Sequence, residues 1–290
     1  MSKFNVLIVQ PKGFEHVEVF RDLADTICAS LVDLGHESKV TVRHAQKNAR
    51  LILLNFHSMA DFKRVVDVLP SDTIIVNTEH LWDRRALNNR FEVNAVDWET
   101  TSRVIFWSQR FETWNIGPEN LSLLFAAGAR NLKSLKLGYH PNLDRIPLSQ
   151  DRPIDILFYG SMSNRRQSLL SSLERAGLKI NHLFGIYGAQ RDQKISEAKV
   201  VLNCSYYPDH IFEAVRVSYP VTNGVLTLSE DHALVDLHFR ESCAFARYPD
   251  LLDEALRIVR EKDWKWRGFA YQQNFKKYRR ADFTKEILEY

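Results

Sequence analysis

One segment of the chain combines a carboxylate, a helical pattern and a turn in a spacing that suits ligand binding. Glu213 follows the strand-like apolar run 200–205 and opens an amphipathic stretch that Pro220 stops. Gly224 then turns the chain into a second apolar run, 225–229. In open α/β sheets, ligands bind at the C-terminal ends of strands, beside helix N-termini. A carboxylate there can accept hydrogen bonds from a ribose diol, and the helix start favours a phosphate. The spacing therefore predicts a nucleotide site.

A second polar cluster follows another apolar run, 155–159. Gly160 and Ser161 come at its end, and a glycine there lets backbone amides approach phosphate oxygens closely. Arg165 and Arg166 follow at the start of the next helix, where the helix dipole disfavours cations. A solvated helix start is the alternative. The unfavourable placement instead indicates that one arginine stabilises a departing nucleoside phosphate in place of a metal ion.

Both charged residues of the first segment also have structural interpretations. Glu213 could be an ordinary acidic helix start that complements the dipole. We favour the binding role because the strand, the carboxylate and the proline all stand at the spacing that a ligand site at a strand–helix junction needs. Arg216 lies about one turn later on the same helical face. It could reach a diphosphate, and a surface salt bridge is an equal alternative.

Composition indicates a globular protein with a sizeable core. The chain has 290 residues, of which 45% are hydrophobic, and a formal net charge of +3. A charge so near zero disfavours a dedicated nucleic-acid binder. Three widely spaced cysteines (Cys28, Cys204 and Cys243) in apolar contexts indicate reduced thiols. No CxxC or HExxH spacing indicates a metal site. The chain enters a strand directly, without a signal peptide or an apolar run near ~18 residues, so we expect a cytoplasmic protein.

Strand-like runs alternate with helical patterns throughout, which predicts parallel sheets with right-handed crossovers. In the first half a helix is expected over 17–34, ended by Gly35, and strands are expected at 5–10, 38–44, 50–56, 72–78, 102–108 and 132–139. In the second half helices are expected up to 176, near 191–198, from 213 and over 250–261. The strands of that half are expected at 155–161, 178–185, 200–206, 225–229 and 243–248.

The fold class predicted is therefore α/β, with two tandem Rossmann-like domains and a cleft between them. Three prolines and little periodicity mark the interdomain linker at 140–153. The first domain would span 1–139 and the second 154–268. The C-terminal helices over 269–290 would pack back toward the first domain.

The second half resembles the nucleotide-sugar-binding domain of GT-B glycosyltransferases. Residues 213–221, EAVRVSYPV, are similar to the conserved helix of that family, which runs Glu-Ala, five residues, Pro-Val. The loop 158–166, the run 185–207 and the segment 137–146 also resemble the family. The resemblance covers roughly residues 135–260. It implies that the second domain holds the nucleotide sugar and the first domain the acceptor.

The resemblance also assigns residues. It implies that Glu213 contacts the ribose and that Tyr187 lies in the stretch that passes the nucleobase. Retaining members often carry a second Glu eight positions earlier, which falls here on Ser205. This departure leaves the donor sugar and the stereochemical course open.

Inverting glycosyl transfer needs a base that deprotonates the acceptor hydroxyl. The candidates are Glu79, His80, His57 and His16, in that order, because each follows or ends a strand where an α/β sheet presents its active-site loops. For any single histidine, a hydrogen-bonded loop or core residue is the alternative.

Two further segments have weaker signals. The turn after the first strand carries Gly13 and Phe14 and could contact acceptor or donor sugar. Its single glycine is not a dinucleotide fingerprint, which disfavours a NAD-dependent oxidoreductase. The basic, aromatic stretch 262–280 suits a packing helix. A solvated basic face and a site for anionic lipid or a polyanionic acceptor are its alternatives.

Together these features predict a metal-independent glycosyltransferase without a cofactor. Its acceptor would be a bacterial polysaccharide or glycoconjugate, with DNA or protein left open. The alternative is a non-catalytic protein that binds a nucleotide or nucleotide sugar on the same scaffold.

Overall fold

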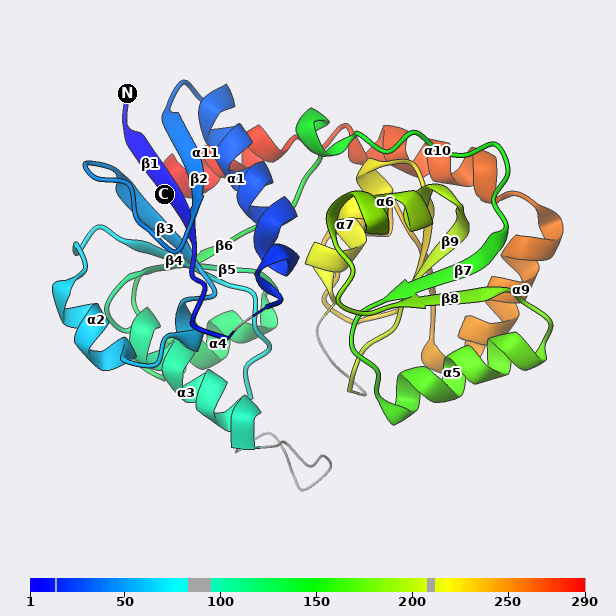
Figure 1. The fold of residues 1–290 in the computed structure, drawn as a ribbon, viewed down its shortest axis with the longest axis horizontal. Coiled ribbons are helices and arrows are strands. Elements are labelled where there is room, and N and C mark those ends of the chain that lie inside the picture. The colour runs from blue at the N-terminus through cyan, green and yellow to red at the C-terminus, as the bar shows by residue number, and fades with distance from the viewer. Residues whose placement is uncertain (14, 83–94, 208–211, 290) are drawn as a thin grey trace. The chain divides into compact units, whose positions relative to one another are not determined.

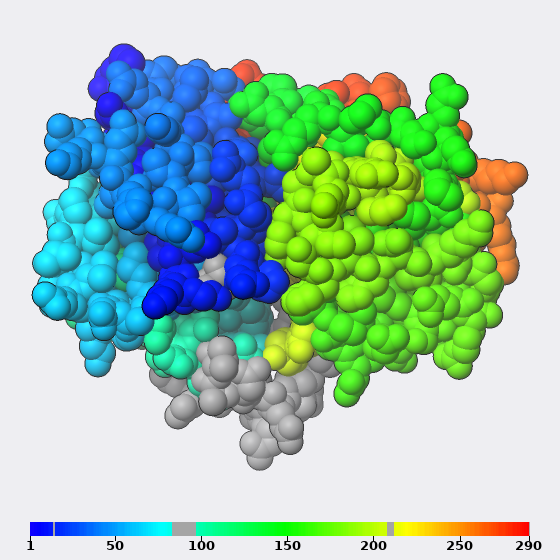
Figure 2. Space-filling view, in the orientation of Figure 1, coloured from blue at the N-terminus to red at the C-terminus, as the bar shows by residue number. Residues whose placement is uncertain are grey.

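A computed structural model describes residues 1–13, 15–82, 95–207 and 212–289 of the chain. Residues 1–136 and 281–290 form one compact unit, and residues 137–280 form a second. Figure 1 shows that each unit consists of a sheet with helices around it. In the view of Figure 2, the front of the second unit is covered by the part of the chain that contains α5, β8 and α6, in green.

The first unit contains a parallel sheet of six strands in the order β2-β1-β3-β4-β5-β6. Its strands are β1 (Lys3–Ile8), β2 (Glu37–Val42), β3 (Arg50–Leu54), β4 (Ile74–Asn77), β5 (Glu112–Asn115) and β6 (Leu132–Ser134). The helices are η1 (Val17–Phe20), α1 (Arg21–Asp33), η2 (Phe56–Ser58), α2 (Phe62–Val68), α3 (Ala95–Ser108), α4 (Glu119–Ala126) and α11 (Arg280–Glu289). The central strands are continuous apolar runs because helices cover both faces of such a sheet.

The second unit contains a parallel sheet of five strands in the order β11-β10-β9-β7-β8. Its strands are β7 (Ile154–Tyr159), β8 (Ile180–Leu183), β9 (Ala198–Asn203), β10 (Leu226–Glu230) and β11 (Ala244–Ala246). The helices are η3 (Pro141–Leu143), α5 (Asn164–Arg175), α6 (Gly188–Ser196), α7 (Ala214–Thr222), α8 (Leu237–Arg240), η4 (Tyr248–Asp250), α9 (Leu251–Glu261) and α10 (Trp264–Phe275). The predicted α/β class with two Rossmann-like sheets is confirmed.

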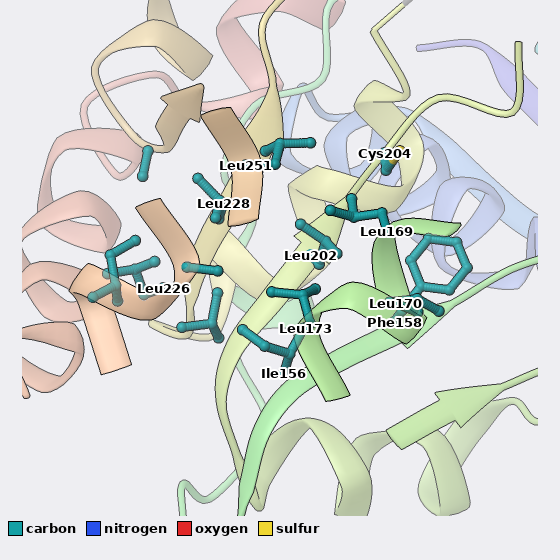
Figure 3. Packing of buried hydrophobic residues seen from close by; sticks show 14 of the residues in the cluster. Ile156, Phe158, Leu169, Leu170, Leu173, Leu202, Cys204, Leu226, Leu228 and Leu251 are labelled. Atoms are coloured by element: carbon teal, nitrogen blue, oxygen red, sulfur yellow. The ribbon is translucent and has the colours of Figure 1, made fainter. Parts of the chain in front are cut away.

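Strand alternation divides the core of the second unit between the two faces of its sheet. Phe158 and Leu202 point to the face covered by α5 and α9, and Leu173 of α5 belongs to the same buried cluster (Figure 3). Leu157 and Val201 point to the opposite face, which carries α6 and α7. Two buried layers therefore hold β7 and β9 in place, and with them the loops that follow.

The strand expected at 102–108 is wrong, because these residues lie in helix α3. Val104 and Trp107, three residues apart, are both fully buried, while Ile105 and Phe106 between them are half-buried. That is the burial period of a helix. A short continuous apolar run cannot separate a strand from a buried helix by periodicity alone. The strand at this point in the chain is β5, in the sequence Glu-Thr-Trp-Asn.

Candidate functional site

The strand order gives each sheet a point at which the order of successive strands reverses. In the second unit, β7 lies between β8 and β9, so the connections that follow β7 and β9 leave toward opposite faces. In the first unit, β1 lies in the same way between β2 and β3. Open α/β sheets bind ligands outside the carboxyl ends of the strands at such a switch point. The loops after β7 and β9, and after β1 and β3, therefore lie at the two switch points.

Glu213 lies at the N-cap of α7, where the sequence places it, in the connection that follows β9. Its carboxylate forms ion pairs with two guanidinium groups, Arg166 from α5 and Arg216 from α7. The Glu213 side chain keeps 27% of its surface exposed, whereas that of Arg166 keeps 2%. Glu213 therefore presents a water-accessible carboxylate that is oriented by two cations.

Arg166 ties the two loops of the switch point together. Its Nε donates to the carbonyl oxygen of Cys204 at 2.8 Å, and its Nη1 donates to that of Ser161 at 2.8 Å. Its Nη2 donates to Glu213. Burial lowers the pKa of Arg166, and the charge of Glu213 opposes that shift. Each nitrogen of the guanidinium thus donates to a described oxygen, so this arginine holds the loops in position.

Arg165 makes a parallel connection one residue earlier. Its two Nη atoms donate to the two carboxylate oxygens of Glu230, which ends β10, and its guanidinium stacks 3.5 Å from the ring centroid of Tyr248. Glu230 also accepts from the backbone N–H of Ser205 at 3.0 Å. Such bidentate pairs are the strongest and most directional of ionic hydrogen bonds. They fix the loop after β9 at Ser205.

Ser205 is buried and lies 3.0 Å, Oγ to Nε2, from His232 in the loop after β10. Burial lowers the pKa of His232, although the charge of Glu230 opposes the shift. Burial also raises the pKa of the neighbouring Cys204 thiol to about 12. The pair of Ser205 and His232 is therefore a neutral hydroxyl–imidazole contact at neutral pH.

Gly160 and Arg216 lie directly against each other. Gly160 has a φ of +139°, and a Cβ at this position would lie 2.7 Å from Nη2 of Arg216. Nη1 of Arg216 donates to Asn203, the last residue of β9, at 3.1 Å. Only a glycine lets the guanidinium come this close to the backbone after β7. The guanidinium of Arg216 therefore contacts both the backbone after β7 and the last residue of β9.

Pro220 does not end its helix, contrary to the expectation, because α7 continues to Thr222. A proline has no N–H to donate to the carbonyl oxygen four residues earlier, which is that of Arg216. The hydroxyl of Tyr159, at the end of β7, donates to this oxygen at 2.7 Å. The side chain of a strand residue thus replaces the missing helix hydrogen bond, and α7 is attached to β7. The turn expected at Gly224 is present, with a φ of +70°.

Ser161 and Tyr187 are also predicted to contact the nucleotide, and their surroundings are less distinctive than those of Glu213 and the arginines. Ser161 is exposed and contributes its carbonyl oxygen to Arg166. Tyr187 is the N-cap residue of α6, in extended backbone conformation, and burial raises the pKa of its hydroxyl.

Two of the four base candidates come together in the first unit. His57 lies in η2 after β3, and Glu79 lies after β4, with Nε2 and Oε1 3.8 Å apart. This distance is too long for a hydrogen bond but short enough for a charge interaction. Burial lowers the pKa of His57, the carboxylate of Glu79 opposes the shift, and Arg103 adds to it. Arg103 also donates to the carbonyl oxygen of His57 at 2.9 Å.

Three buried asparagines hold the backbone at Glu79. Asn77 ends β4 and Asn115 ends β5, and Nδ2 of Asn77 donates to Oδ1 of Asn115 at 2.7 Å. Asn120, on α4, donates to the carbonyl oxygen of Glu79 at 2.8 Å and accepts from the N–H of Leu81 at 3.1 Å. We call Asn77, Asn115 and Asn120 the asparagine cluster. The sequence interpretation missed it, although an asparagine at the end of each of two adjacent strands was a usable signal.

The remaining candidates of the first unit have other surroundings than this pair. His16 is exposed and precedes η1, and Gly13 is exposed with a φ of +84°. His80 packs edge-on against Trp82 at 4.6 Å between ring centroids. Phe14 lies outside the described residues.

Within residues 1–13, 15–82, 95–207 and 212–289, no group of three His, Cys, Asp or Glu side chains is arranged to hold a metal ion. None of the helices in this part of the chain has the length and apolar character needed to cross a bilayer.

Comparison with known proteins shows the fold. No protein-family model matches the chain. Two uncharacterized proteins of Acanthamoeba polyphaga mimivirus are similar in part. L138 is 24% identical over 194 residues, or 64% of this chain, and L137 is 29% identical over 117 residues, or 39%. The chain spans only 20% and 16% of the lengths of these relatives.

Similarity to solved structures extends over almost the whole chain. Sucrose-phosphate synthase from Thermosynechococcus elongatus superposes with a TM-score of 0.62 at 10% identity, covering 99% of this chain and 98% of that one. HepE of Anabaena in complex with UDP and glucose gives 0.60 at 11% identity, covering 98% of both. T4 phage BGT in complex with UDP and Mn²⁺ gives 0.60 at 12% identity, covering 99% of both. The chain therefore has the GT-B glycosyltransferase fold, as the sequence resemblance implied.

Proposed function

We propose that this chain is a glycosyltransferase that moves a sugar from a nucleotide-sugar donor to an acceptor hydroxyl, with the nucleotide bound after β7 and β9. The observation that carries the proposal is the charge cluster at that switch point. Three guanidinium groups (Arg165, Arg166 and Arg216) meet two carboxylates (Glu213 and Glu230), which leaves one net positive charge. An anionic ligand with hydroxyl groups suits such a cluster.

Glu213 is the proposed contact to the ribose. Its carboxylate is the accessible member of the cluster, and two neighbouring hydroxyls of a ribose could donate to its two oxygens. To accept them, Glu213 would give up part of its pairing with Arg216. The guanidinium of Arg216 would then turn its donors to a phosphate oxygen, an exchange of one charge-assisted hydrogen bond for another.

Among the arginines, the contacts favour Arg216 and Arg165 over Arg166 for the phosphate. Arg166 already donates through all three nitrogens and is buried. Arg165 and Arg216 keep 15% and 16% of their side-chain surface exposed. Arg216 also lies against Gly160, the position at which the backbone comes closest to a bound phosphate in this proposal. A cation there would stabilise the nucleoside phosphate as it leaves, without requiring a metal ion.

The first unit would bind the acceptor and supply the base. Glu79 would take the proton of the acceptor hydroxyl while the oxygen attacks the anomeric carbon and the bond to the nucleoside phosphate breaks. His57, whose pKa is lowered by burial, would stay neutral beside it. A glycan or glycoconjugate is the proposed acceptor. DNA is the competing acceptor, because a DNA-modifying β-glucosyltransferase superposes with a TM-score of 0.57.

A thermal-shift screen over UDP, GDP, CMP, ADP and TDP tests the nucleotide site first. A ligand at a hundredfold excess over its Kd stabilises the folded protein by roughly 2.7 kcal/mol. UDP is the first choice, since HepE and T4 phage BGT were both solved with it. Release of free nucleotide from the matching sugar donor then tests turnover. No stabilisation by any of the five would contradict the proposal.

Glu213→Gln is the decisive variant because it keeps the size of the side chain. Loss of the charged acceptor should weaken nucleotide affinity by roughly tenfold or more. Glu174→Ala, an exposed glutamate on α5, is the matched control and should bind like the parent protein. Nucleotide binding without transfer across donors and acceptors would instead support the non-catalytic binding protein.

A further inference from the structure

The rotation of α10 about its axis is fixed by close contact with the sheet of the second unit. A Cβ on Gly268 would lie 2.5 Å from the carbonyl oxygen of Gly224 and 2.9 Å from the backbone nitrogen of Leu226. One turn later, Nε2 of Gln272 donates to the carbonyl oxygen of Thr222 at 2.6 Å. The helix backbone therefore lies directly on the start of β10, where no larger residue than glycine fits.

This fixed rotation turns two large aromatic side chains to the outside. Trp266 and Phe269 lie three residues apart and thus on one face of α10, and they are 64% and 62% exposed. The opposite face buries Trp264 and Phe275. Because Gly268 prevents the helix from turning, the exposed pair cannot be buried by rotation within its own unit. An exposed aromatic pair of this kind marks an interaction surface more often than a lone exposed residue does.

Four cations lie near the aromatic pair along the chain: Lys262 and Lys265 are four residues before Trp266 and Phe269, and Lys277 and Arg279 follow the end of α10. Lys262, Lys265, Lys277 and Arg279 are exposed, and none of them is ion-paired with a carboxylate in the described part of the chain. The acidic neighbours are already paired, Glu261 with Arg257 and Asp263 with Arg267. We call Lys262, Lys265, Trp266, Phe269, Lys277 and Arg279 the aromatic-basic face. It combines apolar area with uncompensated positive charge.

We propose that the aromatic-basic face binds the surface of an anionic lipid bilayer. Tryptophan and phenylalanine enter the region between headgroups and acyl chains, and flanking lysines are attracted to anionic headgroups. Binding would be peripheral, along a helix that lies in the plane of the interface. A second copy of the chain is a poor partner, because four unpaired cations would meet four others. Single-stranded nucleic acid is the other polyanion, and binding of an oligonucleotide in place of vesicles would distinguish it.

Vesicle sedimentation tests the proposal directly on the full chain. The parent protein should bind vesicles of phosphatidylcholine with phosphatidylglycerol, bind pure phosphatidylcholine weakly, and lose affinity at high salt. Trp266→Ala with Phe269→Ala should weaken binding roughly tenfold or more. Lys262→Glu with Lys265→Glu should do the same through charge alone, also by roughly tenfold or more. Phe125→Ala, at a 62% exposed position of the first unit, is the control and should bind normally.

Tryptophan fluorescence gives an independent readout that needs no affinity measurement. Vesicles should shift the emission of the parent protein to shorter wavelength, and Trp266→Phe should abolish that shift while vesicle binding persists. Unfolding midpoints of all variants should match the parent, since every altered side chain is exposed. Failure of the parent protein to bind anionic vesicles would overturn the proposal, as would unchanged binding by both double variants. Binding of a single-stranded oligonucleotide in place of vesicles, lost with the same substitutions, would also overturn it.

Discussion

The two units place polar groups at the same edge of their sheets by different means. After β7 and β9, the second unit uses guanidinium–carboxylate pairs, with Glu213 between Arg166 and Arg216. After β4 and β5, the first unit uses the neutral amides of the asparagine cluster, all nearly inaccessible to water. Neutral amides hold a backbone in one geometry. Charged pairs at a half-exposed position can exchange partners when an anion arrives. Under the proposed function, the acceptor side would be held rigidly and the nucleotide side could adapt to its ligand.

The comparison is tested most strongly at Arg166, which should act as a structural residue despite its place in the charge cluster. Arg166→Met would leave the carbonyl oxygens of Cys204 and Ser161 without their donor and would remove one of the two guanidinium partners of Glu213. We expect the free energy of unfolding to fall by about 3–5 kcal/mol, the cost of breaking a buried pair. Urea denaturation measures it. Arg257→Met, which removes exposed ion pairs on α9, is the control and should cost less than about 1 kcal/mol. If Arg166→Met cost no more stability than Arg257→Met, Arg166 would not be the buried structural residue proposed.

The next largest effect should fall on the chemistry of the first unit. Glu79→Gln should lower kcat by roughly a hundredfold or more, because the proposed base is lost. Nucleotide affinity should not change, since Glu79 lies in the first unit, outside the proposed nucleotide site. Initial rates with the donor found in the screen, together with nucleotide titration, measure both quantities.

His80→Ala is the control for Glu79, because the two are neighbours with different surroundings. If His80→Ala abolishes transfer while Glu79→Gln stays near the parent rate, imidazole carries the role. If both variants remain active, the base is His57 or His16, or the mechanism is retaining and needs no base on the acceptor side.

A smaller effect should appear in the pH dependence of stability. Burial lowers the pKa of His57 in the first unit and of His232 in the second below their ordinary value of 6.5. The unfolded chain then binds more protons than the folded one as the pH falls through that value. Stability should therefore drop on acidification below about pH 6.5, by at most about 1.4 kcal/mol per pH unit for each histidine.

Single substitutions separate the two histidines. His57→Gln and His232→Gln should each flatten the pH dependence, and their effects should add because the sites are in different units. Urea denaturation between about pH 5 and 7 measures the slopes. If neither substitution changed the slope of unfolding free energy against pH, the lowered pKa of both histidines would be contradicted.

The smallest expected effect is that of metal removal on transfer. If cations of the second unit stabilise the leaving phosphate, excess EDTA should leave the rate unchanged. Rates measured with EDTA, and again after addition of Mn²⁺ or Mg²⁺, provide the test. Activity that collapses with the chelator and returns with the metal would refute this mechanism.

Sequence reasoning succeeded where a local signal and its tertiary setting agree. Glu213 caps its helix as expected, and Gly160 directly follows β7 at the switch point, because both positions follow from strand ends and turn chemistry. The partners of these residues could not be predicted. Glu230 ends β10 and His232 follows it, and only the pairing of β10 with β9 brings them to Ser205. The strand wrongly placed at 102–108 failed for the opposite reason, since a buried helix and a buried strand share one composition.

The hydrogen bond between Tyr159 and the carbonyl oxygen of Arg216 joins two positions that are 57 residues apart. Proline at 220 removes the donor that this oxygen would otherwise have, and tyrosine at 159 supplies another. The two positions are therefore expected to vary together in evolution. A relative with an ordinary residue at 220 would be free to lose the tyrosine hydroxyl, and one that keeps the proline would be expected to keep it. An alignment of homologues would then show in which of them this hydrogen bond attaches α7, and with it Glu213 and Arg216, to β7.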